Sequence, residues 1–152
     1  MKVGSRSRKE MREKNTIAEG SRISIVDDDE SMREAIKTLI GSMGSLSVEE
    51  FSSAEDFLNS GQSPVDCLIL DVRMPGLSGL ELQRRLVADN RPLPIVFITA
   101  HYVEQERMRA MEAGAVAFLS KPFTEQELLN AINASLAVDK KVTDGSGEGR
   151  ID

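Results

Sequence analysis

Several polar residues of this sequence have side chains that could together carry out phosphoryl chemistry. Asp27 and Asp28 follow one apolar run, and Asp71, Thr99 and Lys121 each follow another further along the chain. Carboxylate oxygens are the ligands that Mg²⁺ prefers, and a carboxylate can itself accept a phosphoryl group. Phosphoryl transfer also needs the charge on the transferred oxygens to be offset. The cation, the Lys121 ammonium and the Thr99 hydroxyl could each offset the charge of one oxygen.

Each of these residues also has an ordinary structural explanation when it is considered alone. An Asp pair before a helix is commonly an N-cap, worth about 1 kcal/mol. Asp71 precedes a Pro-Gly loop and could be a turn residue. Thr99 could simply end a strand, and Lys121 could be a solvated loop lysine. A shared site is favoured because these residues follow four different apolar runs.

The apolar runs predict a chain in which strands alternate with helices. Strands are expected over 23–26, 46–51, 65–70, 95–98 and 115–119. A helix with apolar residues at helical spacing is expected after each strand. The helix after the fourth strand is expected over 103–113. Ser53 should cap the second helix, and Thr124 with Glu127 should form a capping box for the last.

This pattern predicts an α/β fold of the (βα)5 type, with a doubly wound sheet of five strands. Strands this apolar must be parallel and covered on both faces. In such a sheet, ligands bind at the carboxyl ends of the strands. The polar residues Asp27, Asp28, Asp71, Thr99 and Lys121 all fall at those ends, so we expect them to meet at one edge.

Charge and composition divide the chain into a folded body and two polar ends. The 152 residues carry a formal charge of -6, yet residues 1–22 have an excess of four positive charges. We expect a disordered basic leader over 1–21, one folded domain over 22–137 and a flexible polar tail over 138–152. The acidic body argues against nucleic-acid binding by the folded part.

Membrane, secreted and disulfide-stabilised classes do not fit this composition. No apolar run approaches the length of a transmembrane helix, and no apolar stretch follows the basic N-terminus as a secretory signal requires. The single cysteine, Cys67, cannot form an intramolecular disulfide and is expected to be a small buried residue. A cytoplasmic location fits these features.

Five segments together resemble the CheY-like receiver domain of two-component response regulators. These segments are 26–30, 70–79, 97–101, 113–115 and 118–123. The resemblance extends over about residues 22–137, and the middle motifs are most similar to the FixJ-type subgroup. It implies a flavodoxin-like sheet with strand order 2-1-3-4-5.

The resemblance also implies which residues form the site. Asp71 is then the phosphoacceptor, and Asp28 is a direct Mg²⁺ ligand. Asp27 acts on the ion through water, and the backbone carbonyl of Arg73 is a further ligand. The expected donor is a phosphohistidine on a sensor histidine kinase or a histidine phosphotransfer protein. The role is signalling rather than turnover, with slow intrinsic autophosphatase activity.

Three further residues are implied to convert phosphorylation into a conformational change. Thr99 matches the switch hydroxyl, Phe118 the switch aromatic residue, and Lys121 the lysine of the family motif. The Lys121-Pro122 peptide is expected to be cis. The face formed by residues of about 103–136 is then remodelled, for partner docking or for dimerisation.

Three alternatives stay open at this point. The chain could be the receiver fragment of a FixJ/LuxR-type transcription factor; it contains no recognition helix, so this chain alone should not read DNA. It could be a haloacid-dehalogenase-like Mg²⁺ phosphatase, but those enzymes have a second Asp where this chain has Arg73. It could bind a flavin, which would need a Ser/Thr/Gly-rich loop where this chain has three Asp residues.

Overall fold

Five parallel strands form a single sheet in the order β2-β1-β3-β4-β5. The computed structural model describes residues 20–44, 47–61 and 63–148, with side chains up to residue 137. The strands are β1 (Arg22–Val26), β2 (Ser47–Phe51), β3 (Cys67–Asp71), β4 (Ile95–Thr99) and β5 (Ala117–Ser120). The helices are α2 (Glu30–Gly41), α3 (Ala54–Asn59), α4 (Gly79–Ala88), α5 (Glu104–Glu112) and α6 (Glu125–Glu148). The predicted fold class and strand order are confirmed.

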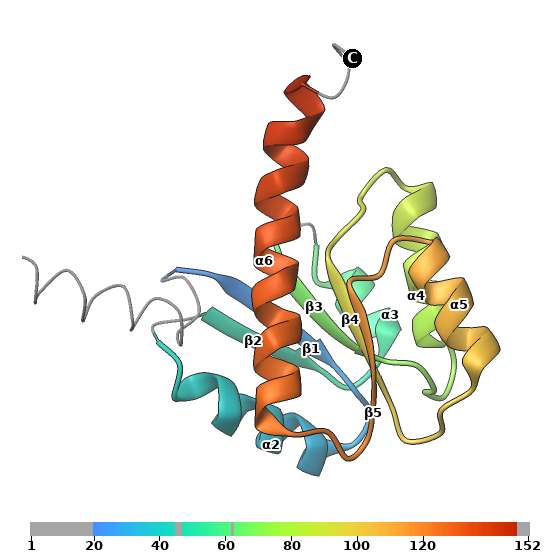
Figure 1. Ribbon diagram of the computed structural model, residues 1–152. Coiled ribbons are helices and arrows are strands. Elements are labelled where there is room, and N and C mark those ends of the chain that lie inside the picture. The colour runs from blue at the N-terminus through green and yellow to red at the C-terminus, as the bar shows by residue number, and fades with distance from the viewer. Residues whose placement is uncertain (1–19, 45–46, 62, 149–152) are drawn as a thin grey trace, which may run out of the picture.

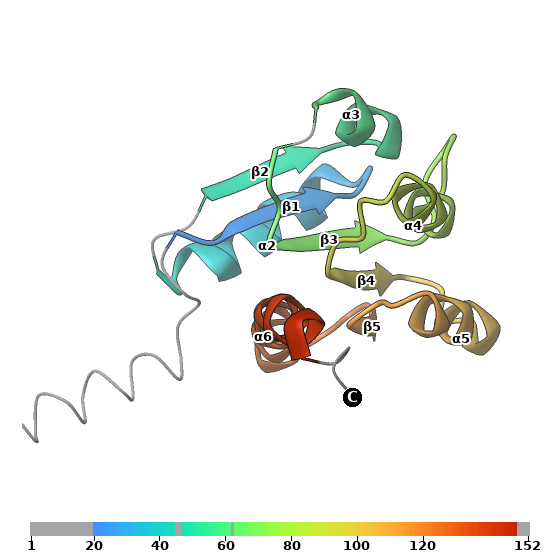
Figure 2. The same ribbon diagram turned by 90° about the horizontal axis from the view of Figure 1, so that it is seen from above.

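The helices cover both faces of the sheet. Helices α2 and α6 pack on one face, and α3, α4 and α5 pack on the other (Figures 1 and 2). Successive residues of β3 alternate between these two cores: Cys67 and Ile69 face α2 and α6, and Leu68 and Leu70 face the other layer. Burial of each large aliphatic side chain contributes about 1.5–3 kcal/mol. The central strands are therefore rigid supports for whatever their carboxyl ends carry.

Side-chain caps fix where several helices begin. Ser53 accepts a hydrogen bond at the start of α3, and Thr124 with Glu127 forms the predicted capping box of α6. A second capping box, made by Ser78 and Glu81, begins α4 and was not predicted. Such caps contribute about 1 kcal/mol each.

Two strands begin two residues later than the sequence predicts, and the other described strand ends differ from the prediction by one residue at most. Strand β3 begins at Cys67 rather than at residue 65, and it includes Asp71 as its last residue. Strand β5 begins at Ala117 rather than at residue 115. The reason is that the Ala115 N–H bonds back to the Ala110 carbonyl and so closes α5. Leu46, the predicted start of β2, lies outside the described residues.

Two observations bear on the predicted domain bounds of 22 and 137, which stay a prediction. Ser21, assigned to the leader, is buried, and its carbonyl accepts a hydrogen bond from the start of β2. The last helix continues to Glu148 rather than ending near residue 137, and it projects beyond the sheet (Figure 1). No proline interrupts this stretch, and Gly145 and Gly147 each weaken a helix by only about 1 kcal/mol. Residues 1–19 lie outside the described part.

Among the helices of the described ranges, none combines the length and the apolar character needed to cross a membrane.

Gly79 lies where α4 begins directly against the carboxyl end of β3. A Cβ atom there would be 2.2 Å from the Asp71 carbonyl oxygen and 3.0 Å from its carbonyl carbon. These are backbone atoms at the end of a sheet strand, so no side-chain rotation can relieve the overlap. We expect Gly79→Ala to lower the free energy of unfolding by about 2–3 kcal/mol, measured by urea denaturation.

Gly41 provides the control for this substitution. It also lies in a helix, but a Cβ atom there would meet nothing within 4 Å. Gly41→Ala should therefore leave stability unchanged or raise it by up to about 1 kcal/mol. If Gly79→Ala were as stable as Gly41→Ala, the close approach of α4 to β3 would be wrong.

Candidate metal and phosphoacceptor site

Three acidic side chains from neighbouring strand ends converge at one edge of the sheet. Asp27 and Asp28 follow β1, and Asp71 ends β3, which pairs with β1 through Val26 and Leu70. One carboxylate oxygen from each of the three acids lies within 4.8 Å of the others. An all-oxygen set with one exposed member suits Mg²⁺, which keeps several waters. The residues present therefore fit this ion.

Asp27 and Asp28 have different surroundings within this cluster. Asp27 is fully buried; its Oδ1 accepts a hydrogen bond from the Asp29 N–H (2.8 Å) and its Oδ2 one from the Lys121 ammonium (3.1 Å). Asp28 is exposed, and its carboxylate has no hydrogen-bond partner among the residues that the structure describes. Asp28 is thus the carboxylate that is free to bind an ion directly.

Lys121 reaches the cluster from the loop after β5. Its Nζ lies 3.1 Å from Asp27 Oδ2 and 3.9 Å from Asp71 Oδ1. Its backbone N–H donates to the Thr99 carbonyl at 2.7 Å, which ties the ends of β4 and β5 together. The Lys121-Pro122 peptide is cis, as predicted. The ammonium group therefore offsets part of the negative charge of the two buried acids.

The surroundings of Asp71 disfavour its ionised form. Burial raises the pKa of the Asp71 carboxyl, and the charge of Asp27 raises it further. The Lys121 ammonium and the backbone N–H of Arg73 act in the opposite direction on this pKa without cancelling the rise. A divalent cation between the carboxylates would relieve this repulsion.

The Thr99 hydroxyl is engaged by its own loop. It donates to the His101 carbonyl (3.0 Å) and accepts from the His101 N–H (3.1 Å). Thr99 itself is buried at the end of β4, beside Ser120 of β5. To contact a group on Asp71, the hydroxyl would have to exchange these bonds for new ones.

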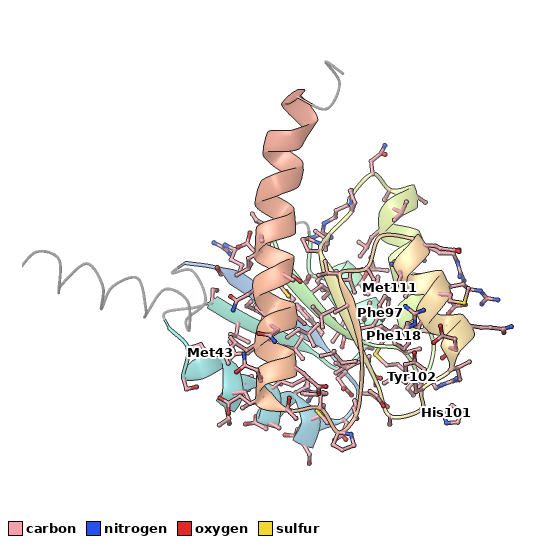
Figure 3. The ribbon with its side chains drawn as sticks, viewed as in Figure 1. Met43, Phe97, His101, Tyr102, Met111 and Phe118 are labelled. Carbon is pink, nitrogen blue, oxygen red and sulfur yellow. The ribbon has the colours of Figure 1, made fainter. Side chains whose placement is uncertain are left out.

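Phe118, the predicted switch aromatic residue, is half-buried between two other rings. Its ring centroid lies 5.9 Å from that of Phe97 and 5.7 Å from that of Tyr102, whose ring meets it edge-on (Figure 3). Tyr102 is 45% exposed, and its hydroxyl donates to Glu104. Tyr102 was not identified from the sequence, where it is only an exposed loop residue.

Two contacts that charged side chains make around the site were also not identified from the sequence. The Arg73 guanidinium forms an ion pair with Glu106 of α5 at 2.9 Å. Glu55 of α3 accepts the Leu77 N–H at 2.9 Å and so supports the loop between β3 and α4. No spacing pattern distinguishes these residues from ordinary surface charges. The predicted role of the Arg73 carbonyl as a metal ligand stays a prediction.

A model of the response regulator receiver domain family matches residues 23–133. The chain belongs to this family. This receiver domain is 51% identical over 115 residues to the response regulator protein TodT of Pseudomonas putida, covering 75% of this chain and 50% of TodT. It is 40% identical over 116 residues to the transcriptional regulatory protein FixJ of Azorhizobium caulinodans, covering 75% of this chain and 54% of FixJ.

A solved structure supports the same assignment. The response regulator StyR superposes with a TM-score of 0.76 and 42% sequence identity, over 86% of this chain and 66% of that chain. The predicted CheY-like family with FixJ-type relatives is confirmed. The chain spans about half the length of the curated relatives TodT and FixJ. Receiver domains are signalling modules.

Proposed function

We propose that this receiver domain accepts a phosphoryl group on Asp71 from a phosphohistidine donor, with Mg²⁺ beside it. Asp28 and Asp71 would bind the ion directly, together with the Arg73 carbonyl, and Asp27 would act through water. The observation that carries this proposal is the convergence of the three carboxylates within 4.8 Å, with the Lys121 ammonium among them. The donor would be a sensor histidine kinase or a histidine phosphotransfer protein.

The chemistry follows from the groups that face Asp71. One carboxylate oxygen of Asp71 attacks the phosphorus atom, and the P–N bond of the phosphohistidine breaks with its electron pair left on the imidazole nitrogen. The Lys121 ammonium, 3.9 Å from Asp71 Oδ1, offsets charge on one phosphoryl oxygen. The Thr99 hydroxyl donates to another once it leaves His101. Bound Mg²⁺ supplies further charge neutralisation. Slow attack by water on the phosphorus atom breaks the bond between phosphorus and the Asp71 oxygen, releases inorganic phosphate and restores the Asp71 carboxylate.

The phosphoryl group adds nearly two negative charges to the site, and this change drives the proposed switch. Thr99 would turn toward the phosphoryl oxygens, and Phe118 would move inward. Helix α5 is suited to follow, because only Ala110 of this helix is buried. A helix with so little apolar burial is weakly held and readily displaced. The face of α5, β5 and α6 would then dock a partner or form a homodimer.

A second candidate function concerns a larger regulator. The domain would act as the receiver part of a FixJ/LuxR-type transcription factor whose output domain binds DNA. In support, TodT and the regulatory protein FixJ are about twice as long as the segment matched here. The acceptor chemistry at Asp71 is the same under both candidates, so the second adds only an output domain.

Titration with beryllofluoride and Mg²⁺ tests the proposed switch, because beryllofluoride occupies the position of the phosphoryl group on an aspartate. We expect amide NMR shifts near Asp71, at Thr99 and Phe118, and along α5, with little change at α3. Sedimentation of the same samples reports whether the face forms a homodimer. Shifts confined to the immediate surroundings of Asp71 would contradict a switch that reaches this face.

A further inference from the structure

We infer that Arg33 is a positioning residue for the metal site, because it fixes the peptide plane that joins Asp27 to Asp28. This inference rests on the proposed function, since it concerns the same Mg²⁺ site. Arg33 lies in the first turn of α2. This turn directly follows the acidic loop, which is formed by residues 27–29. The Arg33 side chain is only 14% exposed, as charged side chains are when they are paired.

The Arg33 guanidinium uses two of its donor directions at once. One terminal nitrogen donates to the Asp27 backbone carbonyl at 2.6 Å, and Nε donates to Glu50 Oε1 on β2 at 2.8 Å. A planar guanidinium held on two sides has little freedom to rotate. Arg33 therefore links the acidic loop to the sheet through a rigid bridge.

The bridge acts at the position that sets the direction of Asp28. The Asp27 carbonyl and the Asp28 N–H belong to one planar peptide unit, so holding the carbonyl also fixes the backbone entering Asp28. Before this unit, the Asp27 N–H is held by the Phe51 carbonyl at 3.1 Å. After it, Asp29 caps α2 through the N–H groups of Ser31 and Met32. Arg33 holds the unit between these two anchors.

Asp28 is the residue that needs such support. No residue in the described ranges donates a hydrogen bond to its carboxylate, so its direction depends on its backbone. When a group that hydrogen-bonds to a metal ligand and orients it is removed, the affinity for the metal commonly falls. In this site the orienting contact is made to the backbone instead of to the ligand side chain.

Charge and positioning predict opposite effects when Arg33 is replaced. The guanidinium is a positive charge near the acidic cluster, so its charge alone opposes binding of a cation. If Arg33 acted only through its charge, removing it would tighten Mg²⁺ binding. If it acts by holding the Asp27 carbonyl, removing it weakens Mg²⁺ binding.

Lys37 offers a matched control one turn further along α2. It also pairs with Glu50 and, in addition, with Glu34. Within the described ranges it forms no hydrogen bond or ion pair with residues 27–29. Lys37→Met and Arg33→Met each remove one positive charge and one partner of Glu50, and each keeps an apolar stem. Only Arg33→Met removes the hydrogen bond to the Asp27 carbonyl.

Calorimetric Mg²⁺ titration of the purified full chain, with Mn²⁺ binding followed by electron paramagnetic resonance, tests the inference. We expect Arg33→Met to raise the Kd about tenfold while Lys37→Met does not raise it. A Kd for Arg33→Met that equals or falls below the wild-type value would overturn the positioning role. If wild-type protein bound no Mg²⁺, the proposed function itself would fail, which is a different result.

Circular dichroism checks that the variants are folded, and a second variant covers the case in which Arg33→Met is not. Arg33→Lys keeps the charge but lacks the planar pair of donors that reaches both Asp27 and Glu50. Weaker Mg²⁺ binding by Arg33→Lys than by wild type supports positioning. Wild-type binding by Arg33→Lys would show that Mg²⁺ affinity does not depend on the two-donor bridge, and would overturn the positioning role.

Discussion

Asp71→Asn should abolish phosphoryl uptake and at the same time stabilise the metal-free protein. An amide cannot replace the carboxylate as the attacking group, so hydroxylamine-labile label transferred from a phosphohistidine donor should fall to background. The pKa of Asp71 is raised in the folded protein, so ionisation destabilises the fold as pH rises above the ordinary Asp range. At neutral pH the neutral amide should therefore add about 1 kcal/mol or more of stability, measured by urea unfolding with chelator present.

Asp66→Asn is the control for this substitution. Asp66 precedes the amino end of β3, at the opposite edge of the sheet, where its carboxylate accepts the Arg22 N–H. Label uptake should be as in wild type, and metal-free stability should not rise. Persistent labelling of Asp71→Asn at the wild-type level would rule out Asp71 as the acceptor.

Asp28→Asn is expected to have the second large effect, on the metal. The exposed carboxylate that no described residue binds is replaced by an amide, a weaker ligand without charge. We expect the Kd for Mg²⁺ to rise by about a hundredfold, measured by calorimetry. Wild type should gain about 2.7 kcal/mol of stability at a Mg²⁺ concentration of 100 times its Kd. The variant should gain almost nothing at that concentration.

Asp29→Asn is the control that distinguishes loss of a metal ligand from loss of a negative charge. The Asp29 side chain accepts the Ser31 N–H as the N-cap of α2, a role that Asn fills about as well. Asp29→Asn removes one negative charge beside the cluster but leaves Asp28 free to bind. An equal loss of Mg²⁺ affinity in both variants would mean that Asp28 acts through general electrostatics instead of as a ligand.

The fold and the convergence of the acids followed from local sequence patterns. Alternating apolar and helical segments predict a parallel sheet, and a parallel sheet brings all carboxyl strand ends to one edge. Asp28, Asp71 and Lys121 therefore meet where the strand positions alone place them. Caps with a fixed spacing, such as Thr124 with Glu127, were predictable for the same reason.

Contacts that no fixed sequence spacing marks were not predictable in this way. The bond from Arg33 to the Asp27 carbonyl and the pairing of Arg73 with Glu106 join charged residues that resemble solvated ones in any pattern. The orientation of the Thr99 hydroxyl toward His101 depends on the loop conformation, which residue types do not determine. The end of α6 was misplaced because its last turns lack the apolar spacing that marks a packed helix.

Chemical mapping of the phosphorylated residue tests whether Asp71 is the phosphoacceptor. The chain is incubated with Mg²⁺ and a phosphohistidine donor, reduced with borohydride, digested and sequenced by mass spectrometry. Borohydride converts an aspartyl phosphate to homoserine, so we expect homoserine at position 71 and at no other aspartate. Homoserine at a different position, or a phosphoryl group that survives as a stable ester on a hydroxyl side chain, would contradict it.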